Sequence, residues 1–486
     1  MKSRNLTLIF LALVLTANLA ACGGDTPSGN NIDTNPDSGE TNSTETTDDG
    51  LAHDDLGDIR FDGETFNMWL AYEELAGYIM EETTGDVFDD AVFARNMAVE
   101  ERLGVKIEYY ISGYDFGGGG YAQGFKDIRN YVMSGDTTFD VFEHVQNGLA
   151  GGCIDDGLFV DWNDVPNVDL TKEYWYRNAI DNINYGENLY RVVGFYENAI
   201  LAATNCIFFN KRIFEENDVA FPYAQALAGT WTIDSLMKII TQTTADLNGD
   251  TALDRTIDQF GYLGRSYNTP PALLIALGGD CIARDENNMP KDVIMTERNS
   301  DIIDRLLALN NPVEGTEIIG DTAEMRQLFI DAHTATVHGE LGYANDYFRD
   351  MKDDFGFVPY PKFDEKQENY CSYIRGSAPL TYIPSTNTGK NLEMTGAVLE
   401  VMACESYNRV VPAYVDVVLT TKVTRDTESE QMVPIILDSA SFYDHVLVDF
   451  DVVNCYFNNT TLAVEYAKHE GYVKSVIETL TKTYTK

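Results

Sequence analysis

Apolar and polar positions repeat along the chain in the order of strand, helix and strand. Residues 66–70 alternate between apolar and polar or smaller side chains, which predicts a strand. Apolar residues in the range 88–103 recur at helical spacing and stop before Gly104, and the alternation resumes over 105–109. Repetition of this unit predicts an α/β fold, in which a sheet carries helices on its faces.

A second unit of the same kind follows. Helical spacing over 125–133 ends at Gly135, and a short apolar strand is expected over 139–142. Open sheets of this type bind ligands beyond the carboxyl ends of their strands. We therefore expect the site in three loops after the strands, at residues 69–74, 112–121 and 143–147.

The first residues of the chain have the features of an export signal. Lys2 and Arg4 precede an apolar stretch over 6–17, which is shorter than the roughly 20 residues of a membrane-spanning helix. The sequence Leu-Ala-Ala-Cys over 19–22 resembles a bacterial lipobox, which is cleaved before its cysteine. We expect removal of residues 1–21 and a lipid on Cys22; an ordinary signal peptide with an unrelated cysteine is the alternative.

Residues 22–56 are expected to form a disordered tether behind the lipidated cysteine. This stretch consists mainly of Gly, Ser, Thr, Asn, Asp and Pro, and it lacks the apolar side chains that would offset the entropy cost of ordering. The chain beyond it is longer than the roughly 100 to 200 residues of one domain, so two or more lobes are expected.

The net charge limits the classes of binding partner, and the cysteine spacing bears on disulfides and metal sites. The 34 basic and 78 acidic residues give a formal charge of -44, which argues against nucleic acid and anionic lipid as partners. Neutral and cationic ligands remain open. The seven cysteines are widely spaced and include no C-x-x-C pair, so the sequence indicates neither a disulfide framework nor a zinc site.

Motifs in the middle of the chain resemble the family 1 extracellular solute-binding proteins. The order of an asparagine-lysine pair, a proline and a threonine-tryptophan pair is similar to a signature of that family. Further similar segments follow in the same order as in the family. The matching segments are Ile207–Phe214, Pro222, Thr230–Asp234, 246–250 with 259–261, 355–362, 383–385, 399–400, and Lys422, 424–426 and Ser429.

The resemblance implies a two-lobed, periplasmic-binding-protein-like α/β fold of type II, with a hinge and a cleft between the lobes. It implies capture of a sugar and delivery to the permease subunits of an ABC importer, without catalysis, and we expect a monomer. Contacts of the ligand with both lobes would favour a closed state. By analogy, the first lobe comprises residues 57–195 and 376–415, and the second comprises 196–375 and 416–486.

Aromatic and polar residues in the predicted loops are the candidate ligand contacts. Flat aromatic rings bind the apolar faces of a sugar, and polar groups fix its orientation. For any single tyrosine, plain packing is the favoured interpretation, whereas a subset that lines the cleft is expected to bind ligand. Glu340 and Arg375 can pair with each other instead. Paired glycines before Asp280 would let a ligand approach the backbone. The candidates are Trp69, Tyr72, Tyr114, His144, Tyr196, Tyr267, Asp280, Glu340, Tyr343 and Arg375, with Glu73, Tyr121 and Glu197 as further possibilities.

An acidic loop suggests a structural calcium ion. Asp246, Asn248, Asp250 and Asp254 stand at alternating positions that are typical of a calcium-binding loop. Thr251 replaces the glycine of that motif, and its final glutamate is missing. An ion-free turn held by Asx hydrogen bonds is the alternative.

Signatures of enzymes are weak in this sequence. It contains no G-x-S-x-G, no H-E-x-x-H and no phosphate-binding glycine loop. The large number of acidic residues makes chance carboxylate pairs uninformative about glycoside hydrolysis. We therefore expect a lipid-anchored receptor for a carbohydrate, with a cell-surface carbohydrate-active enzyme or a sensory receptor as alternatives.

Overall fold

The computed structural model divides the chain into two compact units, Met1–His53 and Asp54–Lys486. Every helix and strand named below belongs to the second unit. The predicted signal peptide, Cys22 and most of the predicted tether lie outside the described residues, as do Glu73 and Lys422. The structure describes residues 50–72, 79–114, 120–145, 152–420, 427–442, 454–455 and 458–485.

The first sheet has four strands in the order β12-β3-β1-β2. The central strand β1 runs parallel to both β2 and β3, and β12 pairs with β3 in the antiparallel direction. The predicted strands are present, but β1, β2 and β3 all reach further than expected. Trp69, Tyr114 and His144 therefore lie inside strands and not in the loops predicted over 69–74, 112–121 and 143–147. The bounds are β1 (Thr65–Tyr72), β2 (Lys106–Tyr114), β3 (Val141–Val145) and β12 (Pro379–Tyr382).

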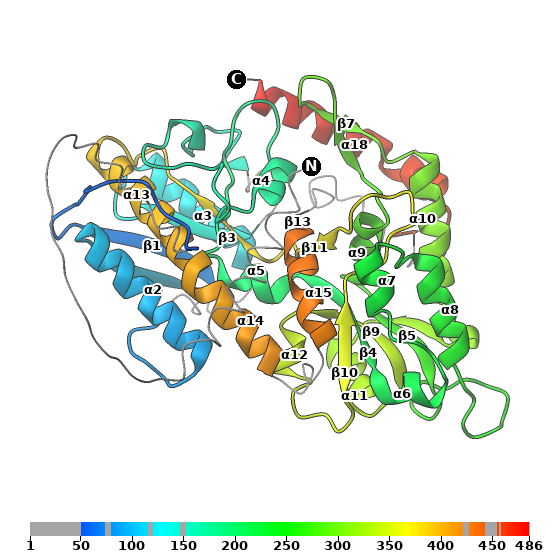
Figure 1. Cartoon of the computed structure of the whole chain (residues 1–486). Helices are drawn as coiled ribbons and strands as arrows, with labels where there is room; N and C mark the ends of the chain where they lie inside the picture. The colour runs from blue at the N-terminus through cyan, green and yellow to red at the C-terminus, as the bar shows by residue number, and fades with distance from the viewer. Residues whose placement is uncertain are drawn as a thin grey trace, which may run out of the picture. The chain divides into compact units, whose positions relative to one another are not determined.

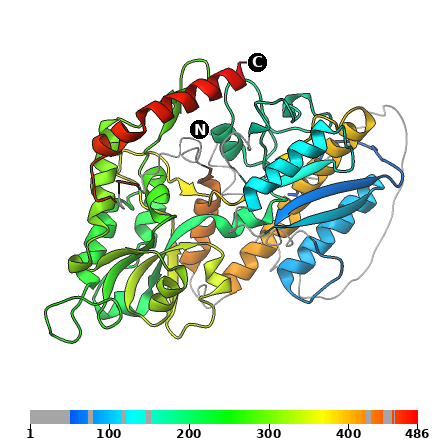
Figure 2. The same ribbon diagram turned by 180° about the vertical axis from the view of Figure 1, so that it is seen from behind.

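Helices cover both faces of this sheet. Helix α2 (Val87–Leu103) begins at Asp86, whose carboxylate accepts backbone N–H groups of the first turn, and ends at Gly104 with φ +67°. It lies beside α13 (Lys390–Glu405) (Figure 1). On the other face, α3 (Gly120–Met133) packs against β2 and β3 (Figure 2). This arrangement confirms the predicted α/β layering.

The second sheet has five strands in the order β10-β4-β9-β5-β8. Strand β5 is parallel to β9 and β8, whereas β4 is antiparallel to its neighbours β9 and β10. The mostly apolar segment from 200 to 209 divides into α5 (Asn198–Ala203) and the fully buried strand β4. The strands are β4 (Asn205–Asn210), β5 (Phe260–Arg265), β8 (Thr316–Ile319), β9 (Thr334–Glu340) and β10 (Phe355–Val358).

The remaining elements surround the two sheets or connect them. Two short ladders pair β6 with β7 and β11 with β13. No helix in the described ranges combines the length and the apolar composition needed to cross a membrane. The strands are β6 (Ile282–Arg284), β7 (Pro290–Asp292), β11 (Ser372–Tyr373) and β13 (Ala440–Ser441), and the short helical turns are η4 (Trp162–Asp164), η5 (Pro312–Glu314) and the π-helical η6 (Ser406–Val410). The helices are α4 (Arg177–Ile183), α6 (Lys211–Glu216), α7 (Tyr223–Ala228), α8 (Ile233–Thr243), α9 (Thr269–Ala276), α10 (Glu297–Ala308), α11 (Thr322–Ile330), α12 (Tyr343–Asp346), α14 (Val411–Thr420), α15 (Thr427–Asp438) and α18 (Leu462–Tyr484).

The motifs behind the family resemblance have structural roles. The side chain of Asn210 accepts the N–H of Ile213 at 3.2 Å and so caps α6. The indole N–H of Trp231 donates to the carbonyl of Pro359 at 2.9 Å, and the backbone N–H of Lys362 donates to the Trp231 carbonyl at 3.0 Å. Two motifs that are distant in sequence therefore contact each other in the second half of the fold.

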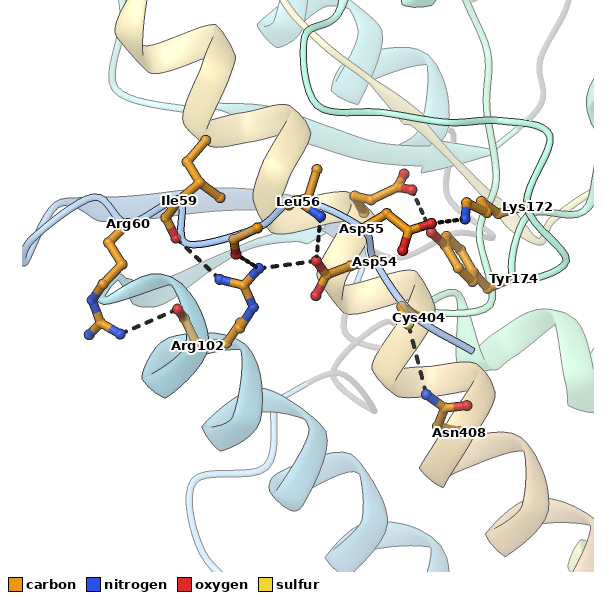
Figure 3. Close-up of polar contacts among 12 residues, drawn as sticks. Asp54, Asp55, Leu56, Ile59, Arg60, Arg102, Lys172, Tyr174, Cys404 and Asn408 are labelled. Atoms are coloured by element: carbon orange, nitrogen blue, oxygen red, sulfur yellow. Dashed lines mark hydrogen bonds and ion pairs between the residues drawn. The ribbon is translucent and has the colours of Figure 1, made fainter. Parts of the chain in front are cut away.

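The segment Asp54–Arg60 lies across α2 and α13 and is held mainly by Arg102 (Figure 3). The Arg102 guanidinium donates to Asp54 Oδ1 at 3.1 Å and to the carbonyls of Gly57 and Ile59 at 2.6 and 3.2 Å. Asp55 pairs with Lys172. The ordered body thus begins at Asp54, slightly before the predicted end of the tether at residue 56.

Substitution Arg102→Ala should release this segment. Loss of three charge-assisted hydrogen bonds at a partly buried side chain should cost about 1 to 3 kcal/mol of unfolding free energy. Thermal melting should show a lower Tm, and limited proteolysis should cleave the variant within 54–60. Lys474→Ala, which removes an exposed ion pair with Glu470, should change neither readout. Unchanged proteolysis of the Arg102 variant would contradict this role.

Candidate functional site

The carboxyl ends of the parallel strands of the first sheet bring three predicted site residues to one edge. Tyr72 ends β1, Tyr114 ends β2, and His144 is the penultimate residue of β3. The Tyr72 hydroxyl lies 2.8 Å from Nδ1 of His144, whose ring stacks on Phe125 at 3.9 Å between centroids. Tyr114 donates to the Asp127 carboxylate, and this hydrogen bond raises the pKa of Tyr114.

His144 is fixed by its surroundings. The backbone N–H of Val145 donates to Nδ1 at 2.8 Å, so Nδ1 is an acceptor and the Tyr72 hydroxyl also donates to it. A β carbon at Gly124 would lie only 2.4 Å from His144 Nε2, so a glycine is required there. The histidine is fully buried, and it orients Tyr72 at the end of β1.

The corresponding edge of the second sheet carries a buried ion pair. Glu340 ends β9 and Arg265 ends β5. The Glu340 carboxylate lies 2.9 Å from Nη1 of Arg375 and 3.5 Å from Nη1 of Arg265, and it accepts a hydrogen bond from Asn268 Nδ2 at 3.0 Å. Burial raises the pKa of Glu340, and the two arginines oppose that shift. Pairing between Glu340 and Arg375, one of the two interpretations left open by the sequence, is what the structure shows.

The buried hydroxyl group of Thr381 links strand β3 of the first sheet to the segment around Tyr196. Oγ1 of Thr381 in β12 lies 2.6 Å from the Tyr196 hydroxyl and donates to Glu143 Oε2 at 3.2 Å. Burial raises the pKa of Glu143 to about 8, and it raises the pKa of Glu197 well above its ordinary value. These carboxyl groups therefore hold their protons at a pH where most carboxyl groups have lost them.

Several buried polar side chains in this part of the fold carry N or O atoms that have no hydrogen-bond partner. Most buried polar atoms in proteins are paired, because an unpaired one costs about 1 to 3 kcal/mol. Although Thr381 opposes the pKa shift of Glu197, neither carboxyl oxygen of Glu197 has a partner within 3.5 Å. The unpaired atoms belong to Tyr176 (Oη), Glu197 (Oε1, Oε2), Asn198 (Oδ1, Nδ2), Asn205 (Oδ1), Arg375 (Nε) and Tyr414 (Oη).

These six residues, called the polar cluster below, lie around the passage of the chain from α5 into β4. Tyr414 is near enough to Tyr176 and Glu340 for their charges to raise its pKa, although burial is the main cause. Asn205 faces Glu340 across the β4–β9 pair, and the backbone N–H of Arg375 donates to the Ala203 carbonyl at 3.2 Å. The cluster thus combines hydroxyl, amide and carboxyl groups from both halves of the fold, and such a set suits a ligand rich in hydroxyl groups.

Other predicted site residues lie apart from the polar cluster or serve the core. Trp69 is 1% exposed and packs edge-on against Phe142. Tyr343 is also buried, whereas Tyr267, which follows β5, is 66% exposed. The Asp280 carboxylate accepts the N–H of Ile282 at 3.1 Å, which is a local turn contact.

Sequence reasoning missed most of the polar cluster. It named Glu197 and Arg375, but not Tyr176, Asn198, Asn205 or Tyr414. Nothing in the spacing of these residues points to a shared site, because they come from a loop, a helix, a strand and a distant second helix. One signal was available in the sequence. Glu197 and Asn198 are adjacent polar residues directly before the apolar residues 199–203, and such a polar pair could have indicated a buried polar site.

The acidic loop uses its side chains for turns. Asp246 accepts the N–H groups of Gly249 and Thr251 at 2.7 and 2.8 Å, and Asn248 accepts that of Asp250 at 2.8 Å. Similarly, Asp254 accepts the backbone N–H of Thr256 at 2.8 Å. Across the described part of the chain, no group of three or more His, Cys, Asp or Glu side chains is placed to hold a metal ion. Calcium at Asp246, Asn248, Asp250 and Asp254 stays a prediction.

Comparison with known proteins identifies the fold. Neither a protein-family model nor a curated protein matches the sequence. A cyclo/maltodextrin-binding protein complexed with maltotetraose is similar, with a TM-score of 0.56, 11% identity, and coverage of 87% of this chain and 99% of that one. The GacH receptor of Streptomyces glaucescens, solved unliganded and with acarbose, has a TM-score of 0.52, 14% identity, and coverage of 86% and 99%.

A third similar structure is an ABC substrate-binding protein of Listeria monocytogenes in complex with cycloalternan, with a TM-score of 0.51, 13% identity, and coverage of 87% and 100%. At these identities the likeness establishes the fold. The chain has the two-lobed, type II fold of the periplasmic binding proteins, as the sequence predicted. The resemblance to family 1 solute-binding proteins therefore holds at the level of the fold.

The buried carboxyl group of Glu143 should make stability depend on pH. Its pKa of about 8 in the folded chain exceeds the ordinary value of 4.5, so the folded state holds its proton to higher pH than the unfolded state. This contribution is complete below about pH 4.5 and is lost as pH rises toward 8. Urea unfolding at pH 5 and pH 8 should show lower stability at pH 8.

Glu143→Gln should reduce this difference, because an amide does not titrate. Other carboxyl groups with raised pKa values, such as Glu400, act in the same direction and will leave part of the slope. The exposed control Glu478→Gln should retain the full wild-type difference. An equal difference in the Glu143 variant and the wild type would exclude Glu143 as a source.

Proposed function

We propose that the protein is a lipid-anchored, extracytoplasmic solute-binding protein that captures an oligosaccharide for an ABC importer and performs no covalent chemistry. The lipid anchor at Cys22 and the export of the chain rest on the lipobox-like sequence. The permease partner rests on the fold and on the resemblance of the motifs. Calcium in the acidic loop would be structural.

The polar cluster is the observation that carries the proposal. Side chains that remain buried and unpaired without a ligand reduce the stability of the fold, and they are retained where a ligand supplies the missing partners. A saccharide has both donors and acceptors on each hydroxyl group, so it can satisfy amide, phenol and carboxyl groups together. The similar proteins solved with maltotetraose, acarbose and cycloalternan support this ligand class.

Ligand capture is proposed to couple to movement of the lobes. Tyr176 belongs to the predicted first lobe, whereas Asn205 and Arg375 belong to the predicted second lobe, so a ligand bound by all three favours their approach. The lobes also meet at the β6–β7 hairpin. There, the Gly186 N–H donates to the Asn288 carbonyl at 2.9 Å, and Asn288 Nδ2 donates to the Gly186 carbonyl at 2.6 Å.

Asn198→Ala should separate ligand binding from stability. Removing an unpaired buried amide should leave the Tm within a few degrees of the wild-type value or raise it, because no protein contact is lost. The same change should weaken binding of the oligosaccharide roughly tenfold or more, measured by calorimetry. The library should contain maltooligosaccharides and other neutral and acidic oligosaccharides, with mass spectrometry to confirm that a bound sugar is recovered unchanged.

Thr381→Val is the matched control for that experiment. It removes a buried hydroxyl that does have partners, so it should lower the Tm markedly. If Asn198→Ala lowers the Tm as much and leaves affinity unchanged, the polar cluster is structural and the proposal fails. Hydrolysis of the bound sugar would support the enzyme alternative instead.

Asn288→Ala should accelerate ligand release. The variant loses the side-chain half of the contact with Gly186, which stabilises the proposed closed state. Stopped-flow displacement of a bound oligosaccharide should show a larger dissociation rate constant, with the association rate constant changed much less. Asn345→Ala, which removes a weak exposed contact at 3.4 Å with Asp346, is the control. Equal release rates would show that the hairpin does not contribute to closure.

A further inference from the structure

Three arginines meet at the carboxyl edge of the second sheet. Arg265 ends β5, Arg326 lies on α11, and Arg375 lies between β11 and β12. All three are near enough to Glu340 for their charges to lower its pKa. Strands β5 and β9 and helix α11 lie together in Figure 1. In a chain with 34 basic and 78 acidic residues, this concentration of cations is unexpected for a plain structural contact.

The carboxylates at this edge do not balance the arginines. Glu340 binds both Arg375 and Arg265. Asp346 is the other described carboxylate near these arginines; it accepts a hydrogen bond of 3.4 Å from Asn345, and the charge of Arg326 acts on it. Among the described residues, three guanidinium groups therefore face two carboxylates.

Arg326 lies near the carboxylates of Glu340 and Asp346; burial raises the pKa of both, and the charge of Arg326 opposes that shift. Its guanidinium carbon lies 3.6 Å from the centroid of the Tyr347 ring and 5.3 Å from that of Tyr343. Within the described structure it has no ion pair and no hydrogen bond. The two rings hold the guanidinium plane by cation–π contacts and leave its N–H groups available.

Arg375 offers a second available donor. Its Nη1 binds Glu340, but its Nε–H is buried and has no acceptor. An Nε–H beside an Nη–H forms the fork with which arginine binds a carboxylate or sulfate group through two parallel hydrogen bonds. Tyr267, which follows β5 and precedes Asn268, is 66% exposed and adds an accessible aromatic ring after the strand that ends at Arg265.

We infer that the oligosaccharide bound by this protein carries an anionic group, a uronate carboxylate or a sulfate ester, which pairs with Arg326 and Arg375. This inference rests on the proposed function and specifies its ligand class. The negative charge of the whole protein disfavours approach of an anion from solution, so a local set of arginines is what such a ligand requires. A neutral sugar would leave Arg326 without an ion pair.

The test compares acidic and neutral oligosaccharides of equal length on the purified full chain. The acidic set includes uronate-containing tetrasaccharides from pectin and alginate and sulfated tetrasaccharides from carrageenan, and maltotetraose represents the neutral set. Calorimetry should show at least tenfold tighter binding of one acidic class. Which of the two acidic classes binds distinguishes a carboxylate from a sulfate.

Arg326→Gln should weaken that binding roughly tenfold to a hundredfold, because one charge-assisted pair is lost while the side chain can still lie on Tyr347. Arg305→Gln removes the same charge from an exposed arginine that pairs with Asp234, and it should have little effect. Arg375→Gln is the second variant, and its Tm reports whether loss of the Glu340 contact disturbs the fold.

Two results would overturn the inference. Equal or tighter binding of maltotetraose than of every acidic oligosaccharide would exclude an anionic ligand but leave the receptor proposal intact. Unchanged affinity in Arg326→Gln would exclude the proposed contact. Binding of no saccharide in either set would overturn both this inference and the proposal that the ligand is an oligosaccharide.

Discussion

The structure depends on one short passage of chain between the two sheets. Val192 exchanges backbone hydrogen bonds with Thr381 at the edge of the first sheet, and Asn205 begins β4 in the second sheet. The residues between them have to cross the junction while they remain buried, so their polar side chains cannot turn toward water. This constraint decides how the polar groups at the junction are satisfied. Each of them either pairs inside the protein or stays unpaired, and an unpaired group is available to the proposed ligand.

The carboxyl groups at this junction illustrate how the constraint is met. Glu143 has one partner, the Thr381 hydroxyl, and Glu197 has none within hydrogen-bond distance. Keeping their protons avoids the larger cost of burying unpaired negative charges. A protonated carboxyl group is also a donor, so these residues can give a hydrogen bond to a ligand oxygen as well as accept one. Burial thus widens the range of hydroxyl orientations that the polar cluster can bind.

The sequence predicted the layered fold well, because periodicity and helix ends are local properties. The helix over 88–103 and its end at Gly104 agree with the structure, since Asp86 and Gly104 fix its two ends through their own backbone geometry. Strand ends were predicted less well. Trp69 and His144 were expected in loops, but both are core residues, and an aromatic or histidine side chain looks the same in sequence whether a strand continues or ends there. The local sequence pattern was therefore sufficient to predict the fold, but it did not predict where the strands end.

The site was less accessible, for a different physical reason. Tyr176 and Tyr414 meet only because separate segments return to the same passage between the sheets, and no local rule encodes that meeting. Glu340 and Arg375 were named as candidates and pair with each other, but their surroundings include Arg265 and Arg326, which the sequence analysis had no reason to include. Arg326 becomes informative only in the assembled structure, where its guanidinium lies over two tyrosine rings and near the carboxylates of Glu340 and Asp346 but forms an ion pair with neither. The proposed preference for an acidic ligand thus depends on a long-range balance of charge, which emerges only from the assembled edge of the second sheet.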